Sequence, residues 1–415
     1  MIHILSSVLW SITTTMIIVS GLKFTKKLNY VQFKLSQIFK SLHASNIKVL
    51  FLTLAGRIGV GSIAGVALAI YLGGPGTIFW MWILVFVSAP LTYSETVLAV
   101  KYKEKKTGGP SQYIKKGINN NNLAVVYSVI VIISYLLGFI PIQANTIVKS
   151  FDSITQINHI IIGISLAILT FTIIKGGIKK ITKVTNYLVP IMGLIYIIIT
   201  IIIIINHIDK LPNIIKEIVY SAFNFKSFIS GFIPTLLIGI QRGIFSNESG
   251  LGLGAIAASS SSNKNASQIG YIQILGVYLT TCIICTATAF IILLSDYHDL
   301  IISNPNGIEF TTKAFEYHFG NKGSFILFIC ILLFSFSTVL TGHYYCESSL
   351  KTLKAKTKII PLLTPLSIMF GSLNSSSLIW SSVDILVAIL GIINIYAINK
   401  LNKEIVSYHK KYGRI

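Results

Sequence analysis

Two stretches of the chain combine glycines, small polar residues and an arginine within apolar surroundings. The first reads GRIGVGSIAG over residues 56–65, and the second reads RGIFSNESGLGLG over residues 242–254. Each glycine inside a helix costs about 1 kcal/mol relative to alanine, so an uninterrupted helix would not concentrate them. Where a helix unwinds, its freed N–H groups attract an anion such as a carboxylate, and its freed carbonyls suit a small cation such as Na⁺. The two stretches therefore predict a binding site for a small charged or zwitterionic molecule.

The composition predicts the kind of structure that positions these stretches. Only 11% of the 415 residues are charged, against roughly 25% in soluble proteins. The hydrophobic fraction is 53% and the mean hydropathy is +0.75. These values exclude a soluble domain, a nucleic-acid-binding module, a disulfide scaffold and a disordered chain, and they predict a polytopic, all-α membrane protein.

Eleven apolar segments have the length of a transmembrane helix, which needs about 20 residues. We treat the first as a leading helix and the others as core helices 1 to 10. The predicted spans are residues 4–22, 46–72, 77–100, 123–149, 157–175, 184–206, 228–256, 268–295, 323–350, 359–373 and 376–400.

The placement of lysine and arginine predicts the orientation of these spans. If the N-terminus is outside, 26 of the 34 basic residues lie in cytoplasmic segments and 6 lie in outer loops. This asymmetry follows the positive-inside rule and accounts for the net charge of +21. We therefore expect a cytoplasmic C-terminus and location in a bacterial-type plasma membrane. The predicted divisions are a leading helix with a basic segment (1–45), a first five-helix repeat (46–206), an extracellular connection (207–227), a second repeat (228–400) and a basic tail (401–415).

The two glycine-rich stretches occupy matching places in this layout, because each lies in the first helix of a five-helix group. Since five is odd, the second group is inverted relative to the first. Paired interruptions in inverted halves indicate a secondary-transporter site near the membrane midplane. Close helix packing through small residues is the alternative. An ion channel is disfavoured because filter loops and charged rings are missing from the sequence, and an enzyme because it contains no H-E-x-x-H or G-x-S-x-G motif.

Several motifs resemble the alanine or glycine:cation symporter family. The strongest are AGRIGVGSIAGVA (55–67), GGPGTIFWMW (73–82) and RGIFSNESG (242–250), and weaker ones are GGP (108–110), QAN (143–145), CTATA (285–289), FST (336–338) and YYCE (344–347). The resemblance implies a leucine-transporter-type fold of two inverted five-helix repeats preceded by one extra helix. It also implies symport of small neutral amino acids, alanine or glycine, with Na⁺ as the coupling ion and no cofactor. Ser62 departs from the family, which usually has Asn there.

Taken with this fold, the sequence suggests two sets of ligands. The substrate set comprises Gly59, Val60, Gly61, Ser62, Gln143, Asn145, Ser246 and Asn247, with the Val60 and Gly61 N–H groups holding the carboxylate. The cation set comprises the carbonyls of Ala55 and Ile58 and the hydroxyls of Ser337 and Thr338. The same hydroxyls could instead bond to carbonyls of their own helix.

Charged residues within the spans form a third group, because an unpaired charge is costly inside a bilayer. We expect Arg57 and Arg242 to form gating or structural ion pairs with Glu248, Glu95 or Glu347. Glu248 could alternatively neutralise the substrate ammonium or carry a proton. In that last case coupling to H⁺ would replace coupling to Na⁺.

Overall fold

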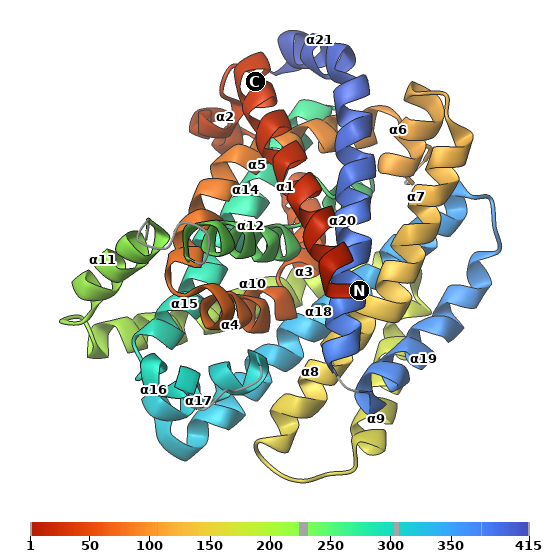
Figure 1. The fold of residues 1–415 in the computed structure, drawn as a ribbon. Helices are drawn as coiled ribbons and strands as arrows, with labels where there is room; N and C mark the ends of the chain where they lie inside the picture. Colours follow the sequence, from red (N-terminus) through yellow and green to blue (C-terminus); the bar gives the residue numbers. More distant parts are fainter. Residues whose placement is uncertain (1, 106, 224–230, 303–306, 375, 414–415) are drawn as a thin grey trace.

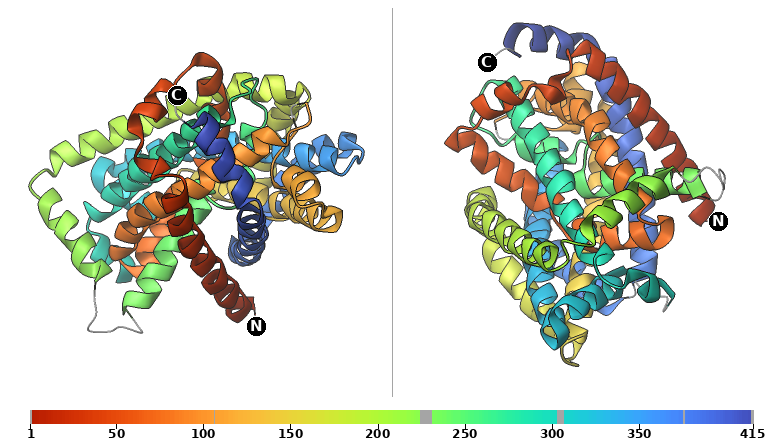
Figure 2. Two further views of the ribbon diagram at one scale, coloured as in Figure 1. Left: turned by 90° about the horizontal axis from the view of Figure 1, so that it is seen from above. Right: turned by 90° about the vertical axis from the view of Figure 1, so that its left-hand side faces the viewer.

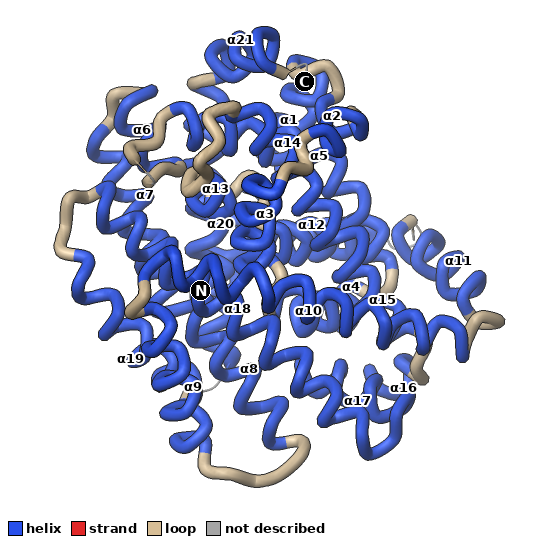
Figure 3. The backbone as a smooth tube through the Cα atoms, turned by 180° about the vertical axis from the view of Figure 1, so that it is seen from behind, coloured by secondary structure: helices blue, strands red, loops and turns tan. Residues whose placement is uncertain are grey.

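The computed structural model describes residues 2–105, 107–223, 231–302, 307–374 and 376–413 (Figure 3). Its regular structure is helical, and within the described ranges the only β pairing is an isolated bridge between Glu104 and Thr107. In the first part of the chain the helices are α1 (Ile2–Lys27), α2 (Leu35–Lys40), α3 (Ala44–Arg57), α4 (Val60–Gly73), α5 (Gly76–Lys101), α6 (Pro110–Gly117), α7 (Asn121–Ser134), α8 (Ile140–Asp152), α9 (His159–Ile174), α10 (Gly177–Asn206) and α11 (Leu211–Ala222).

The second part of the chain is equally helical. Its helices are α12 (Ile233–Asn247), α13 (Leu253–Ala258), α14 (Ala266–Tyr278), α15 (Thr286–Leu293), α16 (Tyr297–Ile302), α17 (Gly307–Phe319), α18 (Gly323–Thr352), α19 (Ile360–Leu373), α20 (Ser376–Lys400) and α21 (Asn402–Tyr412). Two π-helical turns, η2 (Tyr135–Phe139) and η5 (Leu279–Cys285), join α7 to α8 and α14 to α15. Such turns are frequent at functional sites.

Seven helices of the described chain are long and apolar enough to cross a membrane, or eight if the bent pair α3–α4 is one span. The prediction of an all-α membrane protein is confirmed, whereas the count of eleven spans stays a prediction. The remaining predicted spans correspond to α9, α19 and the interrupted α12–α13. Residues 228–230 of one predicted span lie outside the described residues.

The leading helix α1 packs lengthwise against α20 and also contacts α5 (Figure 1). A Cβ atom on Gly21 would lie 2.2 Å from the carbonyl oxygen of Val87, so glycine permits this close approach. In the interface with α20, Thr13 Oγ1 donates a hydrogen bond to the Ala388 carbonyl over 3.1 Å. The N-terminal end of α1 projects beyond the body of the molecule (Figure 2).

The first predicted interruption separates α3 from α4. The two helices meet at an angle of 44°, and Ile58 and Gly59 between them leave the helical conformation. Gly59 has extended backbone with φ −125° and ψ −155°. The amides of the first turn of α4 therefore start at the centre of the protein rather than at a membrane surface.

The second predicted interruption separates α12 from α13. Glu248, Gly250 and Gly252 have φ values of 56°, 80° and 81°, in the left-handed region that glycine adopts readily. These residues unwind the chain over residues 248–252 before α13 begins. Because α4 packs against α12, the two interruptions lie next to each other in the middle of the molecule (Figure 1).

Candidate functional site

The first turn of α4 faces α8 across the first interruption. The amide of Val60 donates a 3.0 Å hydrogen bond to Gln143 Oε1. A Cβ on Gly59 would lie 2.4 Å from Thr338 Oγ1, so only glycine fits there. Gln143 thus joins the break as expected, but it takes up the Val60 amide that was predicted to hold a carboxylate. The amide of Gly61, also in the first turn of α4, has no acceptor within the helix.

Oxygen atoms from α3 and α18 converge below this turn. The hydroxyls of Ser337 and Thr338 donate to the Ala55 carbonyl over 3.1 and 3.0 Å. Both also lie within hydrogen-bond distance of the Phe334 carbonyl of their own helix, as the alternative interpretation expected. Their role as cation ligands stays a prediction. Ile58 is buried at the end of α3, next to the same group. Carbonyl and hydroxyl oxygens are the ligands that hard cations prefer.

The second interruption contributes a chain of small polar groups. Ser62 Oγ lies 2.8 Å from Ser246 Oγ, which lies 3.1 Å from Cys285 Sγ. Thr288 Oγ1 donates to the Ser62 carbonyl over 2.8 Å. Ser62 and Ser246, both predicted as substrate residues, therefore contact each other directly, while Cys285 in η5 was not anticipated.

Asn247 stabilises the unwound segment itself. Its Nδ2 donates to Thr281 Oγ1 over 3.1 Å, and its Oδ1 accepts from the Ser249 amide over 3.0 Å. Both ends of this side chain therefore have partners within the protein, and its contacts are structural in this conformation.

Asn145 is the predicted substrate residue that the structure does not bring to the break. Its Nδ2 donates to the carbonyls of Gly371 and Asn374, over 3.2 and 2.7 Å, at the end of α19. Gln143, on the same helix α8, contacts α4 instead. In this conformation Asn145 thus joins α8 to α19.

An aromatic layer covers the site on the side from which α12 enters. The rings of Phe139 and Trp380 each pack on Phe245, at centroid distances of 5.1 and 5.2 Å. A Cβ on Gly61 would lie 2.9 Å from the Phe245 ring, so Phe245 limits the space above the break. The guanidinium of Arg242 lies 5.4 Å from the centre of the Trp380 ring.

Arg242 forms a bidentate ion pair above this layer. Its Nη1 and Nη2 donate to Asp384 over 3.2 and 2.7 Å, and both side chains are largely buried. The predicted pairing of Arg242 with Glu248, Glu95 or Glu347 is therefore wrong. Glu347 pairs with Lys351 one turn away on α18, because that helix end faces solvent. Arg57, Glu95 and Glu248 are buried together beside the second interruption.

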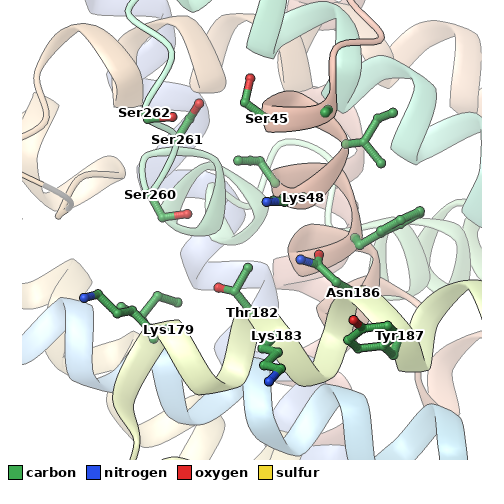
Figure 4. Close-up of a pocket in the computed structure, with 15 residues that line it drawn as sticks. Ser45, Lys48, Lys179, Thr182, Lys183, Asn186, Tyr187, Ser260, Ser261 and Ser262 are labelled. Atoms are coloured by element: carbon green, nitrogen blue, oxygen red, sulfur yellow. The ribbon is translucent and has the colours of Figure 1, made fainter.

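A cavity of about 840 Å³ opens at the end of the molecule opposite the aromatic layer. It lies between the start of α3, the start of α10 and residues 260–262 after α13 (Figure 4). Lys48 points into the cavity, whereas Lys183 points away from it (Figure 4). The cavity exposes the first turns of α3, including Ser45 and Lys48, to solvent.

The chain is similar in sequence to known membrane transporters. The sequence profile of the sodium:alanine symporter family matches residues 1–415. The amino-acid carrier protein AlsT of Bacillus subtilis is 34% identical over 431 residues, covering 100% of this chain and 92% of AlsT. The probable sodium/glutamine symporter GlnT of the same organism is 33% identical, covering 100% of this chain and 90% of GlnT.

A solved structure shares the fold. The crystal structure of MhsT in complex with L-phenylalanine matches with a TM-score of 0.64, covering 86% of this chain and 89% of that one. At 13% identity this likeness concerns the fold alone, which is of the leucine-transporter type.

Proposed function

Because the chain belongs to the sodium:alanine symporter family, we propose that it carries alanine or glycine across the membrane together with Na⁺. Members of this family are transporters rather than enzymes, so the site must bind its substrate on one side of the membrane and release it on the other. The observation that carries the proposal is the meeting of two helix interruptions, α3–α4 and α12–α13, beside a convergent set of oxygen atoms.

The buried first turn of α4 suits the carboxylate of an amino acid. The Gly61 amide and the side-chain amide of Gln143 supply N–H donors, and the start of a helix favours negative charge. The hydroxyls of Ser62 and Ser246 lie beside these donors and can accept from the ammonium group. Phe245 leaves little space next to Gly61, which favours a small side chain. One methyl group changes affinity by about 1–3 kcal/mol, so alanine and glycine should be separated only modestly.

Na⁺ would bind among the carbonyls of Ala55 and Ile58 and the hydroxyls of Ser337 and Thr338. To coordinate the ion, the two hydroxyls turn their protons away from Ala55 and offer lone pairs. The ion then links the end of α3 to α18 in place of the two hydrogen bonds. Since two residues, Ile58 and Gly59, separate the end of α3 from the start of α4, Na⁺ also orders the backbone that receives the carboxylate.

The gating residues support alternating access. Arg242, Asp384, Phe245 and Trp380 close the side from which α12 enters, while the cavity beside α3 opens at the opposite end. With the N-terminus outside, the closed side is extracellular and the cavity is cytoplasmic. Separation of the ion pair would then open the outer path.

The test is uptake of labelled alanine by the purified protein in liposomes, driven by an inward Na⁺ gradient or by an equal K⁺ gradient. We expect accumulation with Na⁺ only, and competition by glycine in excess of that by glutamine. Uptake that ignores Na⁺ and follows pH would replace the coupling ion by H⁺. Stronger competition by glutamine would assign the substrate class named for GlnT, and single-channel current steps would replace the symporter by a channel.

A further inference from the structure

Three buried charged side chains lie around the second interruption, and their charges do not balance. Glu95 on α5, Glu248 in the unwound segment and Arg57 at the end of α3 are exposed by 0%, 1% and 2%. Among the described residues, Arg57 is the cation that interacts with both carboxylates. Arg242 is committed to Asp384. If both glutamates were ionised, the cluster would carry one uncompensated negative charge inside the membrane, which is strongly unfavourable.

The hydrogen bonds distinguish the two carboxyl groups. Glu248 accepts from Tyr135 at Oε1 over 2.8 Å and from Tyr345 at Oε2 over 3.4 Å, so donors face both of its oxygens. In Glu95 one oxygen, Oε2, accepts from the Gly252 amide over 3.0 Å and from Asn394 Nδ2 over 2.8 Å. The other oxygen, Oε1, is buried and has no partner among the residues that the structure describes. Both oxygens of Glu248 are therefore occupied by donors, whereas Oε1 of Glu95 is an oxygen free to carry a proton.

Arg57 is held in place by groups other than the two carboxylates. A Cβ on Gly254 or Gly276 would lie 2.5 or 2.7 Å from its guanidinium nitrogens, so these glycines form a cradle for the group. Its Nη1 donates to the Gln273 carbonyl over 3.2 Å, while Nε and Nη2 have no partner within the described chain. Arg57 carries a single positive charge, so it can offset one of the two carboxylates and not both.

Resting on the proposed function, we propose that Glu95 is a proton-binding site whose occupancy is coupled to the movement of the second interruption. The Glu95 carboxyl binds one proton at Oε1 in the conformation described here. It releases this proton in the step of the transport cycle in which water reaches the carboxyl. A metal ion is a poor alternative, since it needs several oxygen ligands and would lie beside the Arg57 cation. The other titratable groups facing Glu95 are Tyr113 on α6, Tyr127 on α7 and Glu248.

Glu95 is joined to the unwound segment at two points, Gly252 and Gly250, so a movement of this segment changes the surroundings of the carboxyl group. It accepts directly from Gly252, and Asn394 bridges it to the carbonyl of Gly250 over 2.8 Å. Because that carbonyl can only accept, the Asn394 nitrogen is the donor, and Tyr113 bonds to its oxygen. Moving residues 250–252 removes these donors and changes the proton affinity of Glu95. By reciprocity, the proton changes the conformational equilibrium.

The experiment measures Na⁺-driven alanine uptake in liposomes over a series of external pH values, with a pH-sensitive dye inside. The wild type should move protons with alanine, and its rate should vary at least fivefold across the series. Glu95→Gln, a permanently neutral analogue, should keep slower Na⁺-driven uptake whose rate no longer varies with pH and should abolish the alanine-dependent dye signal. Glu104→Gln, at an exposed loop residue paired with Lys116, should behave as the wild type.

The outcomes separate this inference from the proposed function. A Glu95→Gln protein with the pH profile of the wild type would overturn the proton site and leave Na⁺-coupled transport standing. A wild type without Na⁺-driven uptake would overturn the transport proposal itself. If Glu95→Gln does not fold, calorimetry of alanine binding to the wild type in two buffers of different ionisation heat counts the protons exchanged. A nonzero number supports the site, and zero overturns it.

Discussion

Gly61 lies where any larger side chain would fill the space proposed for the substrate. A side chain there would enter the space between the start of α4 and the Phe245 ring, 2.9 Å away at Cβ. We expect Gly61→Leu to abolish alanine uptake while the protein still inserts and purifies as a monodisperse sample. Gly65→Ala is the matched control on α4, because its Cβ would meet no atom closer than 4.0 Å and transport should persist. Normal uptake by Gly61→Leu would remove Gly61 from the substrate site.

Ser337 and Thr338 make a separate prediction about the cation. Each variant, Ser337→Ala or Thr338→Ala, removes one oxygen from the group around the Ala55 carbonyl. We expect the Na⁺ concentration for half-maximal uptake to rise about tenfold, equivalent to about 1.4 kcal/mol. Ser335→Ala on the same helix is the control, since that buried hydroxyl has no partner among the described residues. An unchanged Na⁺ dependence in both variants would contradict the assignment.

At the scale of elements, the ion pair between α12 and α20 controls the aromatic layer. Asp384→Asn leaves the largely buried Arg242 guanidinium without its counter-charge, which favours conformations in which the guanidinium reaches water. Cys285 lies beneath this layer, next to Ser246, and reports its opening. In a protein whose other cysteines, Cys282, Cys330 and Cys346, are replaced by alanine, we expect Asp384→Asn to raise the rate of Cys285 labelling at least tenfold.

The labelling uses a membrane-impermeant thiol reagent applied from the side of the N-terminus. Asp152→Asn is the control, because Asp152 forms a surface pair with His159 and lies outside the layer. Equal labelling rates in Asp384→Asn and its parent would show that this ion pair does not close the path to the site.

The sequence predicted both interruptions because their cause is local. Gly250 and Gly252 lie where the backbone is left-handed, a conformation that glycine adopts readily. Such glycine positions can be recognised in the sequence without knowing which residues they contact. The meeting of Ala55 with Ser337 and Thr338 was expected only through the family resemblance, since nothing local indicates it. Arg242 and Asp384 were not paired, because 142 residues separate them and an acid near the start of a helix also fits a water-facing position.

The sequence also could not predict which of several polar groups forms a hydrogen bond with a given side chain. The Val60 amide is free by the rule for helix starts, but Gln143 reaches it from α8. Asn145 is two residues further along, and helix geometry turns it toward α19. Both side chains are amides, so residue type alone could not assign them to different neighbours.

In the whole molecule, α21 packs the C-terminal end of the chain against α5 and α14. Glu404 bonds to Lys101 and Tyr102, and the Tyr408 hydroxyl accepts from the Ala266 amide over 3.1 Å. His409 lies 2.8 Å from the Tyr93 hydroxyl through Nδ1 and 3.3 Å from Lys34 Nζ through Nε2. Lysine only donates, so Nε2 accepts and Nδ1 carries the proton of a neutral ring.

Acidification should release this helix. Burial, together with the Lys34 ammonium, lowers the pKa of His409 to about 4, from an ordinary value of about 6.5. The undocked state therefore binds the proton first, and docking weakens as pH falls between these two values. A spin label on Lys410→Cys should become more mobile over this window, and His409→Gln should abolish the change. The same mobilisation in His409→Gln would contradict the assignment.

We propose that an amino acid and Na⁺ bind together where the two helix interruptions meet. The most direct measurement is the unfolding temperature of the purified protein with and without alanine, in Na⁺ and in K⁺, for the wild type, Gly61→Leu and Gly65→Ala. A ligand at 100 times its Kd stabilises the folded state by about 2.7 kcal/mol, which gives a measurable shift. We expect alanine to raise the unfolding temperature of the wild type and Gly65→Ala in Na⁺ only, and to leave Gly61→Leu unchanged. Equal stabilisation in K⁺, or in Gly61→Leu, would contradict the account.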